Sequence, residues 1–361
     1  MEVRTQPAPS PGLAGDATVE RAAPSGFIHL GVAREICPIL SELGCDPERV
    51  IEGAELDPSL FDHADSLVSL SALGKLLRLG VERTHCSHLG LLVGRRSTLK
   101  SLRAVGALMR HSETIGDALR NMNSHLRVQN RTAVTQLDVD GDVALLSYLL
   151  YHPTCTGAIQ ILDGALATAC QILRELGGPR LEITEVLLPR RPPIDPEPYR
   201  QLFRAPVRFN QEVAALVFPA EYLKHSVEGA DPVIRRALEF QIAEWEHSCP
   251  ADLKDEMRRL LRAEFLNARS SSSEMAELLS VHRRTLNRRL KAEGTTFKSV
   301  ADEIRFGIAC QLLEDTDLRL VEIAAALHFS EPAAFTRAFR RWSGTTPSNW
   351  RAHVAAQVSE G

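Results

Sequence analysis

The chain has 361 residues, of which 44% are hydrophobic and 24% charged, the composition of an ordinary soluble globular protein. This length allows two or three domains, each with its own core. The formal net charge of −4 would argue against a nucleic-acid-binding protein if it were evenly spread, but it is not: residues 1–250 carry −6 and residues 251–361 carry +2.

Neither a membrane protein nor a secreted protein is indicated. No run approaches the eighteen or more apolar residues that span a membrane, and the N-terminus is rich in Pro, Ala and acid instead of basic and then apolar. We therefore expect a cytoplasmic protein that does not bind membranes. In that compartment we expect its seven cysteines to be reduced and buried, and redox sensing is less favoured because there is no CxxC pair. They are Cys37, Cys45, Cys86, Cys155, Cys170, Cys249 and Cys310.

The N-terminal part is predicted to be an α+β domain. Residues 1–26 are rich in Pro, Ala, Gly and Ser and are expected to form a disordered tail. Helical periodicity then predicts helices over 30–43, 70–81, 99–109 and 115–126. Two β-rich segments, 131–139 and 142–151, flank Asp140-Gly141, which is a hairpin signal. A long helix over 157–176 and strands over 181–188 and 214–218 complete a domain that we bound at 27–224.

A linker and a connecting helix are predicted to follow. Residues 225–232 are polar with Gly229 and Pro232, and residues 233–245 have helical periodicity. We assign 225–252 to this connection. The next domain, 253–356, is expected to be all-α, and its first helix carries Leu253, Met257, Leu260 and Leu261 at helical spacing.

The C-terminal domain contains two helix-turn-helix patterns, over 273–294 and 321–343. In the first, Met275, Ala276 and Leu279 form an apolar face, and Ser271 with Glu274 predicts a capping box. Its second helix buries Leu286 and Leu290 and presents five cations and no acid between Arg283 and Lys291.

The second pattern repeats this layout about fifty residues later. Ile323, Ala324 and Leu327 belong to its supporting helix. Pro332 begins the next helix, where a missing N–H is harmless, and Phe335, Phe339 and Trp342 form the buried stripe of that helix. Between the two patterns, residues 296–313 predict a long joining helix.

These residues resemble the AraC/XylS family of bacterial transcription regulators. The resemblance rests on RRTLNRRL, EIAAALHFSE and AFRRWSGTTP and covers residues 253–351 almost without gaps. The N-terminal part resembles the effector-binding domain of the branch that includes ornithine-responsive regulators, through residues 88–94, 114–119 and 199–209. Many family members have Gly in each helix-turn-helix turn, where this chain has Ser280 and His328. A left-handed residue there costs roughly 1 kcal/mol if it is not Gly.

The resemblance implies a DNA-binding transcription regulator. It also implies that two of its helices enter adjacent major grooves of the DNA, roughly 34 Å apart. Positional match gives the candidates for base contact, which are Arg284, Asn287, Arg288, Glu331, Ala333, Ala334 and Arg337. Arg suits guanine and Asn suits adenine, whereas two alanines offer at most contacts to thymine methyl groups. We therefore expect the first helix to read more sequence than the second. The candidates for phosphate contact are Arg283, Arg289, Arg340 and Arg341.

The implied partners are promoter DNA, RNA polymerase, a small-molecule effector with unknown binding residues, and a second copy of the chain. We expect an effector-responsive activator; an effector-independent regulator or a repressor stays open, and an enzymatic N-terminal domain is disfavoured. No GxGxxG, P-loop, HExxH or GxSxG motif is present, so we expect neither catalysis nor a cofactor. His85, Cys86 and His88 are too isolated to predict a metal site.

Overall fold

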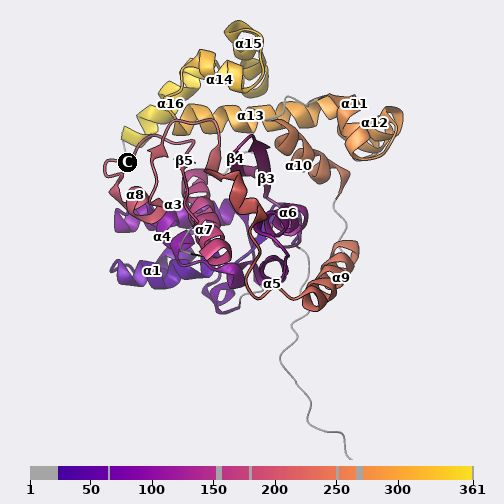
Figure 1. Cartoon of the computed structure of the whole chain (residues 1–361). Helices are drawn as coiled ribbons and strands as arrows, with labels where there is room; N and C mark the ends of the chain where they lie inside the picture. Colours follow the sequence, from indigo (N-terminus) through magenta and orange to yellow (C-terminus); the bar gives the residue numbers. More distant parts are fainter. Residues whose placement is uncertain are drawn as a thin grey trace, which may run out of the picture.

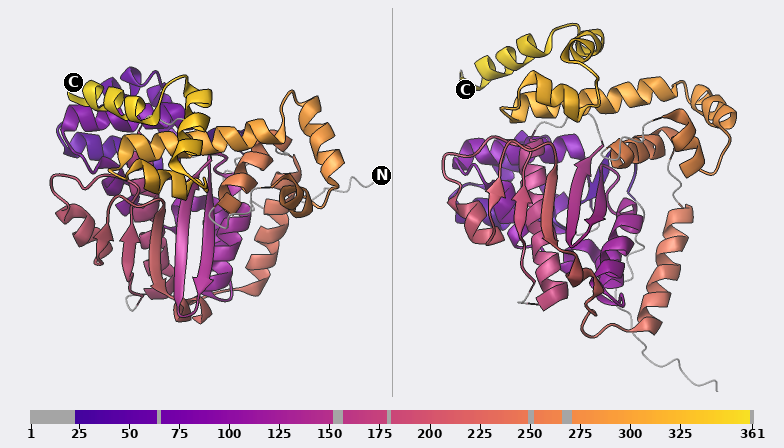
Figure 2. Two further views of the ribbon diagram at one scale, coloured as in Figure 1. Left: turned by 90° about the horizontal axis from the view of Figure 1, so that it is seen from above. Right: turned by 45° about the horizontal axis from the view of Figure 1, so that its top comes forward.

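The computed structural model describes residues 23–63, 66–151, 157–178, 181–248, 252–265 and 271–359. These residues form three layers, with N-terminal helices on one side of a five-stranded sheet and C-terminal helices on the other (Figure 1). Figure 2 shows from above how the long helix α13 (Phe297–Asp315) crosses over the sheet. The predicted α+β N-terminal part and helical C-terminal part are both confirmed. No helix of the described residues combines the length and the apolar composition of a membrane span.

The N-terminal layer consists of short helices around one long central helix, α7. The helices are α1 (Ile36–Glu42), α2 (Pro47–Gly53), α3 (Leu70–Thr84), α4 (Leu89–Arg95), α5 (Arg103–Arg110), α6 (Ile115–His125), α7 (Ala158–Gly177) and α8 (Glu197–Phe203). Short 3-10 helices are η1 (Ala33–Glu35), η2 (Pro58–Asp62), η3 (Leu99–Leu102), η4 (Leu126–Val128) and η6 (Ala220–Lys224).

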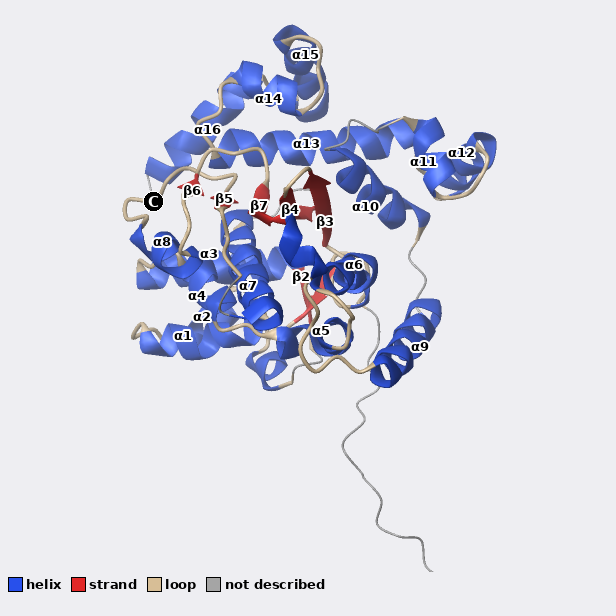
Figure 3. Ribbon diagram, viewed as in Figure 1, coloured by secondary structure: helices blue, strands red, loops and turns tan. Residues whose placement is uncertain are grey.

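The main sheet has the strand order β3-β4-β7-β5-β6, and a separate pair joins β1 to β2 (Figure 3). The strands are β1 (Phe27–His29), β2 (Leu67–Ser69), β3 (Ala133–Asp140), β4 (Val143–Leu150), β5 (Glu185–Leu187), β6 (Val207–Arg208) and β7 (Ala214–Pro219). The predicted hairpin is confirmed: β3 pairs with β4 from Ala133↔Leu150 to Asp140↔Val143. Gly141 in its turn has φ of 57°, which Gly adopts without strain.

The strand predicted over 181–188 is too long. Only Glu185–Leu187 pairs with β7, in the register Glu185↔Val217. This register puts Ile183 opposite Pro219, the last residue of β7, which has no N–H to donate. Leu181 and Ile183 are nevertheless buried in the core, so the alternation that predicted a strand reflects packing without a ladder.

The two faces of the β3–β4 hairpin serve different parts of the chain. Because successive side chains of a strand point to opposite faces, Leu146 packs in the core around α7, whereas Leu149 and Val134 pack in the core of the C-terminal helices. The same pair of strands therefore touches both helical layers.

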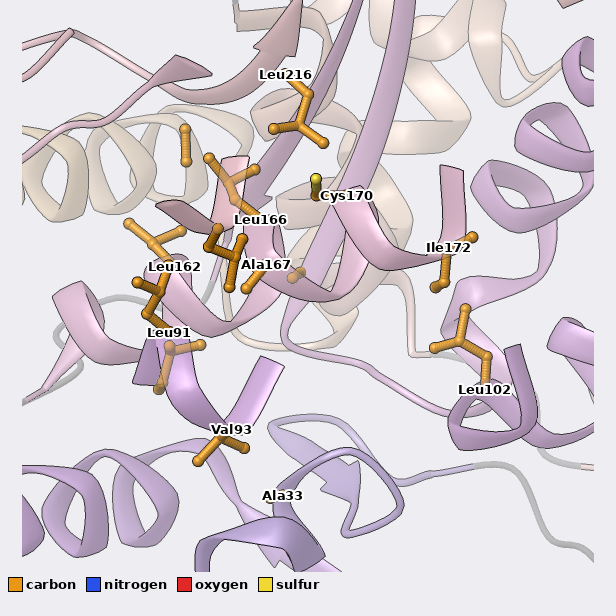
Figure 4. Close-up of a cluster of buried hydrophobic side chains, with 14 of the residues drawn as sticks. Ala33, Leu91, Val93, Leu102, Leu162, Leu166, Ala167, Cys170, Ile172 and Leu216 are labelled. Carbon is orange, nitrogen blue, oxygen red and sulfur yellow. The ribbon is translucent and has the colours of Figure 1, made fainter. Parts of the chain in front are cut away.

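Helix α7 packs very closely against α4. A Cβ atom on Gly90 would lie 1.9 Å from the carbonyl oxygen of Gln160, and one on Gly94 would lie 2.1 Å from that of Gly164, so both α4 positions require glycine. Figure 4 shows the surrounding apolar side chains, among them Leu91 and Val93 from α4 and Leu162 from α7. This close approach fixes α7 under the sheet.

Two of the predicted helices begin with a 3-10 turn instead of an α-helical one. The segment 30–43 contains η1 before α1, and 99–109 contains η3 before α5. In α5 the close contact of Gly106 with the Leu99 carbonyl, where a Cβ would lie 1.8 Å away, accompanies the tighter first turn. The helix predicted over 70–81 continues to Thr84, where His85 ends it in a left-handed conformation with φ of 55°.

The boundary of the N-terminal tail is corrected. Residues 23–26 are bonded to the domain, because the Ala23 N–H donates to the Val128 carbonyl (2.9 Å) and the Gly26 N–H donates to the Arg131 carbonyl (3.1 Å). The rest of the predicted tail, residues 1–22, lies outside the described residues.

The predicted linker also begins later than expected. The His225 carbonyl accepts from the Ile115 N–H (2.9 Å), and the Val227 N–H donates to the Glu113 carbonyl (3.2 Å), so residues 225–227 are attached to the start of α6. The connecting helix is present as α9 (Pro232–Ser248). It packs on the N-terminal domain through Ile242, which contacts Leu108.

The cysteines are only partly as expected. Cys86, Cys170 and Cys310 are buried and unpaired, whereas Cys37 in α1 and Cys45 in the loop after it are half-buried. Burial raises the pKa of the Cys170 thiol to about 11, so it is not a thiolate at neutral pH. Cys155 and Cys249 lie outside the described residues.

Candidate DNA-binding surface

The C-terminal layer consists of two helix-turn-helix units joined by α13. Its helices are α10 (Leu253–Phe265), α11 (Ser272–Leu278), α12 (Arg283–Ala292), α13, α14 (Leu320–Ala326), α15 (Pro332–Ser343) and α16 (Pro347–Ser359). In Figure 1 α12 lies beyond one end of α13 and α15 lies above it. The long joining helix predicted over 296–313 is present as α13, in which Val300, Ile304, Ile308 and Leu312 are buried and Phe297 is half-buried.

The first unit has the predicted capping box. The Glu274 N–H donates to Ser271 Oγ (3.2 Å), and the Ser271 N–H donates to Glu274 Oε2 (2.9 Å). Met275 and Ala276 are buried. Ser280 in the turn has φ of 52°, the left-handed conformation expected there.

Helix α12 presents its charged side chains outward. Leu286 and Leu290 are fully buried, which fixes the opposite face toward solvent. The exposed side chains of this face are Arg283, Arg284, Asn287, Arg288 and Arg289. None of the four arginines forms an ion pair with another described residue, so their charge is available to an external anion.

The second unit is held by its turn as well as by its helices. His328 has φ of 57°, and its Nε2 lies 2.7 Å from the Phe265 carbonyl oxygen, with the two rings 5.0 Å apart. The imidazole thus ties the turn to the end of α10. Phe335 and Phe339 are fully buried and pack edge to face, with ring centroids 5.8 Å apart.

Helix α15 has fewer exposed polar side chains without an ion-pair partner among the described residues than α12. Glu331, Ala333, Arg337 and Arg340 are exposed, and Ala334 is half-buried. Arg337 pairs with Glu331 at 3.1 Å, and since both are well exposed this pair is weak. Arg341 pairs with Asp302 at 3.1 Å and lies 5.8 Å from the centroid of Trp342. Asp302 would therefore compete with a phosphate for Arg341.

One important residue was missed by sequence reasoning. Arg191, in the Pro-rich loop after β5, reaches the C-terminal end of α13. Its N–H donates to the Asp315 carbonyl (2.6 Å), and its guanidinium donates to the carbonyls of Glu314 (2.6 Å) and Thr316 (3.0 Å). The guanidinium also bonds the carboxylate of Asp317 (2.7 Å). A cation supplied by the N-terminal part therefore caps this helix end, where carbonyls lack intrahelical partners.

A buried network holds the loop that carries Arg191. The guanidinium of Arg190 bonds Asp163 of α7 and the hydroxyl of Tyr199 (2.5 Å), and that hydroxyl donates to Asp163 (2.6 Å). Burial raises the pKa of Asp163, and Arg190 opposes that rise. The only sequence signal for this arrangement is an Arg pair in a Pro-rich loop.

A second group of contacts between the layers is made by α10. Arg262 is buried, and its Nε donates to the carbonyl of Leu150 in β4 (2.9 Å). Burial lowers the pKa of this guanidinium to about 10. Nearby, Ser25 Oγ donates to the carboxylate of Asp255 (2.6 Å). The C-terminal helices are thus attached to the sheet at both ends of the layer.

The His85, Cys86 and His88 group is structural in this geometry. His85 ends α3, Cys86 is buried and His88 precedes α4. Among the described residues, no three His, Cys, Asp or Glu side chains come together in a way that could hold a metal ion.

Comparison with protein families decides the affiliation of the chain. Residues 44–227 match the arabinose-binding domain of AraC transcription regulators, and residues 275–353 match a helix-turn-helix domain. The chain belongs to the AraC/XylS family. It is therefore a DNA-binding transcription regulator with an N-terminal effector-binding domain.

Two relatives named as regulators are similar to this chain over nearly their whole length, and a solved structure is similar over most of its own. The ornithine utilization regulator of Pseudomonas aeruginosa is 26% identical, with 90% of this chain and 96% of that protein covered. The HTH-type transcriptional regulator VirS of Mycobacterium tuberculosis is 27% identical over 87% of this chain and 93% of its own length. The crystal structure of the regulator CdpR from Pseudomonas aeruginosa is 25% identical, covers 73% of this chain and 86% of its own, and gives a TM-score of 0.38.

Proposed function

We propose that this regulator reads bases mainly through α12 and uses α15 mainly for positioning. The observation that carries the proposal is the set of exposed arginines on α12 that have no acidic partner in the described chain, together with Asn287 between them. Arg284, Asn287 and Arg288 are the proposed base-contacting residues of α12. The proposed base-contacting residues of the α15 unit are Glu331, Ala333, Ala334 and Arg337. A base contact by Arg337 replaces its ion pair with Glu331.

The proposed phosphate contacts are made by the arginines at the margins of the two helices. They are Arg283, Arg289, Arg340 and Arg341. Phosphate contacts add affinity to every sequence and make it dependent on salt, because each neutralised phosphate releases counterions. Arg341 contributes less than the others because Asp302 competes for it.

A binding-site selection from a random duplex library tests this division. We expect Arg288→Ala to relax the preference at one base pair by about 1 to 3 kcal/mol. Arg337→Ala is expected to relax preference less. Arg283→Ala should weaken binding to all duplexes and reduce the salt slope by about 1. Arg49→Ala, which removes an exposed arginine of the N-terminal domain paired with Asp46, is the matched control. A larger loss of preference for Arg337→Ala than for Arg288→Ala contradicts the proposal.

We also propose that the protein activates transcription as a homodimer in contact with RNA polymerase. Bacterial promoter DNA lies in the cytoplasm, so that is its proposed location. The exposed face of α9 supports the dimer, because Val233 and Phe240 stand one heptad apart on it and are 77% and 70% exposed. Both belong to the connecting helix, which packs on the N-terminal domain through Ile242.

The proposed division of the chain follows the contacts. Residues 27–224 form the effector-binding and dimerisation domain, which the bonds of His225 and Val227 extend to residue 227. The linker and connecting helix then occupy 228–252 in place of the expected 225–252, and the DNA-binding domain occupies 253–356. An effector changes DNA binding in this proposal by shifting the packing of the two domains. The contacts of Arg191 and Arg262 make that packing direct, in addition to the route through α9.

A further inference from the structure

A cavity lies inside the N-terminal domain, between α7 and the β3–β4 hairpin. Its volume is about 130 Å³. Its walls come from segments that are far apart in the sequence, including β1, η1, α1, α3, α6 and α7. In Figure 4 Ile172 of α7 and Leu102 of η3, both in the wall, point toward each other. Sequence periodicity gives no sign of such a space.

The wall of this cavity is mostly apolar. Ile36, Leu77, Met122, Leu126 and Ile172 are representative. Among the described residues that line it there is no Asp, Glu, Lys or Arg. Apart from His29, no side chain of the described wall could supply a counter-charge, so a bound ion would lose its hydration here at a large cost. The wall therefore disfavours ammonium and carboxylate groups.

Three residues of the wall carry a buried hydroxyl that forms no hydrogen bond with a described residue, and two of these hydroxyls are assigned to the cavity side. The hydroxyls of Thr135 on β3 and Thr168 on α7 are buried and form no hydrogen bond with any described residue. Thr168 shares a helical face with Ile161, Ala165 and Ile172, which also line the cavity. Buried polar groups are nearly always bonded, so an unbonded pair facing one cavity indicates a polar group that binds there.

The direction of Thr135 follows from the sheet. Thr135 is opposite Tyr148 in the β3–β4 register, so the two side chains lie on the same face of the sheet. Tyr148 lies two residues from Leu146 and therefore shares its face, which packs in the core around α7. The hydroxyl of Ser147 is also buried and unbonded within the described chain, but Ser147 shares its face with Leu149, toward the C-terminal helices. Ser147 also lines the cavity, and strand alternation assigns its hydroxyl to the other face, so Thr135 is the β3–β4 hydroxyl used here.

We propose that this cavity is the effector site and that it takes a small uncharged molecule with an apolar body and one hydrogen-bonding group. The polar group, a hydroxyl or a carbonyl, bonds Thr135 and Thr168, and the body contacts the aliphatic wall. Cavities of this size hold a ligand on the order of one benzene ring. The inference rests on the proposed effector response and adds the site and the chemical class.

The cavity is also well placed to influence the DNA-binding domain. Thr135 is adjacent on β3 to Val134, whose side chain packs with the C-terminal helices on the other face of the sheet. A ligand that moves β3 acts on that contact without reaching it.

Calorimetric titration of the full-length protein with phenol, cyclohexanol and hexanol tests the site. At least one of these probes is expected to bind saturably. Thr168→Val and Thr135→Val keep the shape of the side chain and remove one hydroxyl, and each should weaken the binding of that probe about fivefold. Ser97→Ala is the matched control, because it removes a buried, unbonded hydroxyl from a residue that does not line the cavity, and probe affinity should not change. Ala169→Phe fills the cavity and should abolish binding.

The outcomes separate this inference from the proposed function. Binding of none of the three probes, equal binding to Ala169→Phe, or tighter binding of L-ornithine or benzoate than of the uncharged probes overturns the inference. Affinity for the selected duplex is measured in parallel, with and without probe. Duplex binding without any probe binding leaves the DNA-binding function standing and rejects the site. Probe binding with unchanged duplex affinity supports the site and counts against the effector response.

Discussion

Replacement of Arg191 by alanine is expected to loosen the DNA-binding domain from the effector domain. The change removes the three side-chain contacts to Glu314, Thr316 and Asp317 and leaves the backbone bond from residue 191 to the Asp315 carbonyl. The effector domain should stay folded, because Arg191 is not part of its core. The C-terminal end of α13 loses the cation that caps it.

The size of the effect follows from the exposure of the side chain. Hydrogen bonds to a charged group contribute about 1.5 to 3 kcal/mol each when buried. The Arg191 side chain is 44% exposed and its partner Asp317 is 59% exposed, so solvent screens the ion pair and the sum must be discounted. We expect a total loss of about 2 kcal/mol, which shifts the docking equilibrium roughly 30-fold toward the released state.

Hydrogen exchange measures this release at one amide. The Asp317 N–H donates to Oδ1 of Asn210 across the interface (2.9 Å), so its exchange rate reports docking. It should exchange roughly 30-fold faster in Arg191→Ala. Arg200→Ala is the matched control, because that arginine is also on the effector domain and pairs only weakly with Glu197, at 3.8 Å. Equal exchange in both variants, or acceleration of every core amide in Arg191→Ala, refutes the reasoning.

Three further predictions concern the turns, the interface and the dimer. Ser280→Gly should raise the free energy of unfolding by about 1 kcal/mol because it relieves a left-handed residue, whereas His328→Gly should not, since it also loses the bond to the Phe265 carbonyl; urea unfolding measures both. Burial raises the pKa of Asp315 to about 7 from 3.8, so the native state binds the extra proton and thermal stability should fall as pH rises from 4 to 7, by at most about 4 kcal/mol. Phe240→Glu on α9 should weaken self-association at least tenfold in sedimentation experiments, because it places a charge in the proposed apolar contact.

Each of these three predictions has a comparison variant and a result that would contradict it. Equal gains for Ser280→Gly and His328→Gly contradict the assigned role of the imidazole. Asp315→Asn should flatten the decline of stability between pH 4 and 7, and an unchanged decline shows that other carboxyls cause it. Gln241→Glu adds the same charge to an exposed neighbour on α9, so the dimer surface is wrong if it disrupts association as much as Phe240→Glu does.

The helix-turn-helix units could be predicted because their signals are local. The capping box of Ser271 and Glu274 and the stripe of Phe335 and Phe339 lie within one or two helical turns, and the structure confirms both. The hairpin at Gly141 was predictable for the same reason. Where a boundary depended on a distant partner, as with Pro219 and the shortened β5, the local pattern was wrong.

Neither the contacts between the two domains nor the cavity in the N-terminal domain could be predicted from local sequence patterns. Arg191 and its partners on α13 are separated by more than a hundred residues, and an arginine in a Pro-rich loop has no local feature that specifies a helix end as its partner. The cavity depends on the packing of several segments, and Thr135 and Thr168 look like ordinary strand and helix residues in the sequence. The DNA-contacting roles assigned to α12 and α15 stay predictions.

Arg262 gives the contact between α10 and the sheet an unusual character. A permanent interface is generally filled with apolar side chains, but this one encloses a guanidinium that keeps its charge at neutral pH, bonded to a backbone carbonyl. When α10 separates from β4, that cation regains its water, and the recovered hydration offsets part of the lost apolar contact. The buried charge therefore lowers the cost of separating the two surfaces, and an uncharged residue of similar volume at this position is expected to raise that cost.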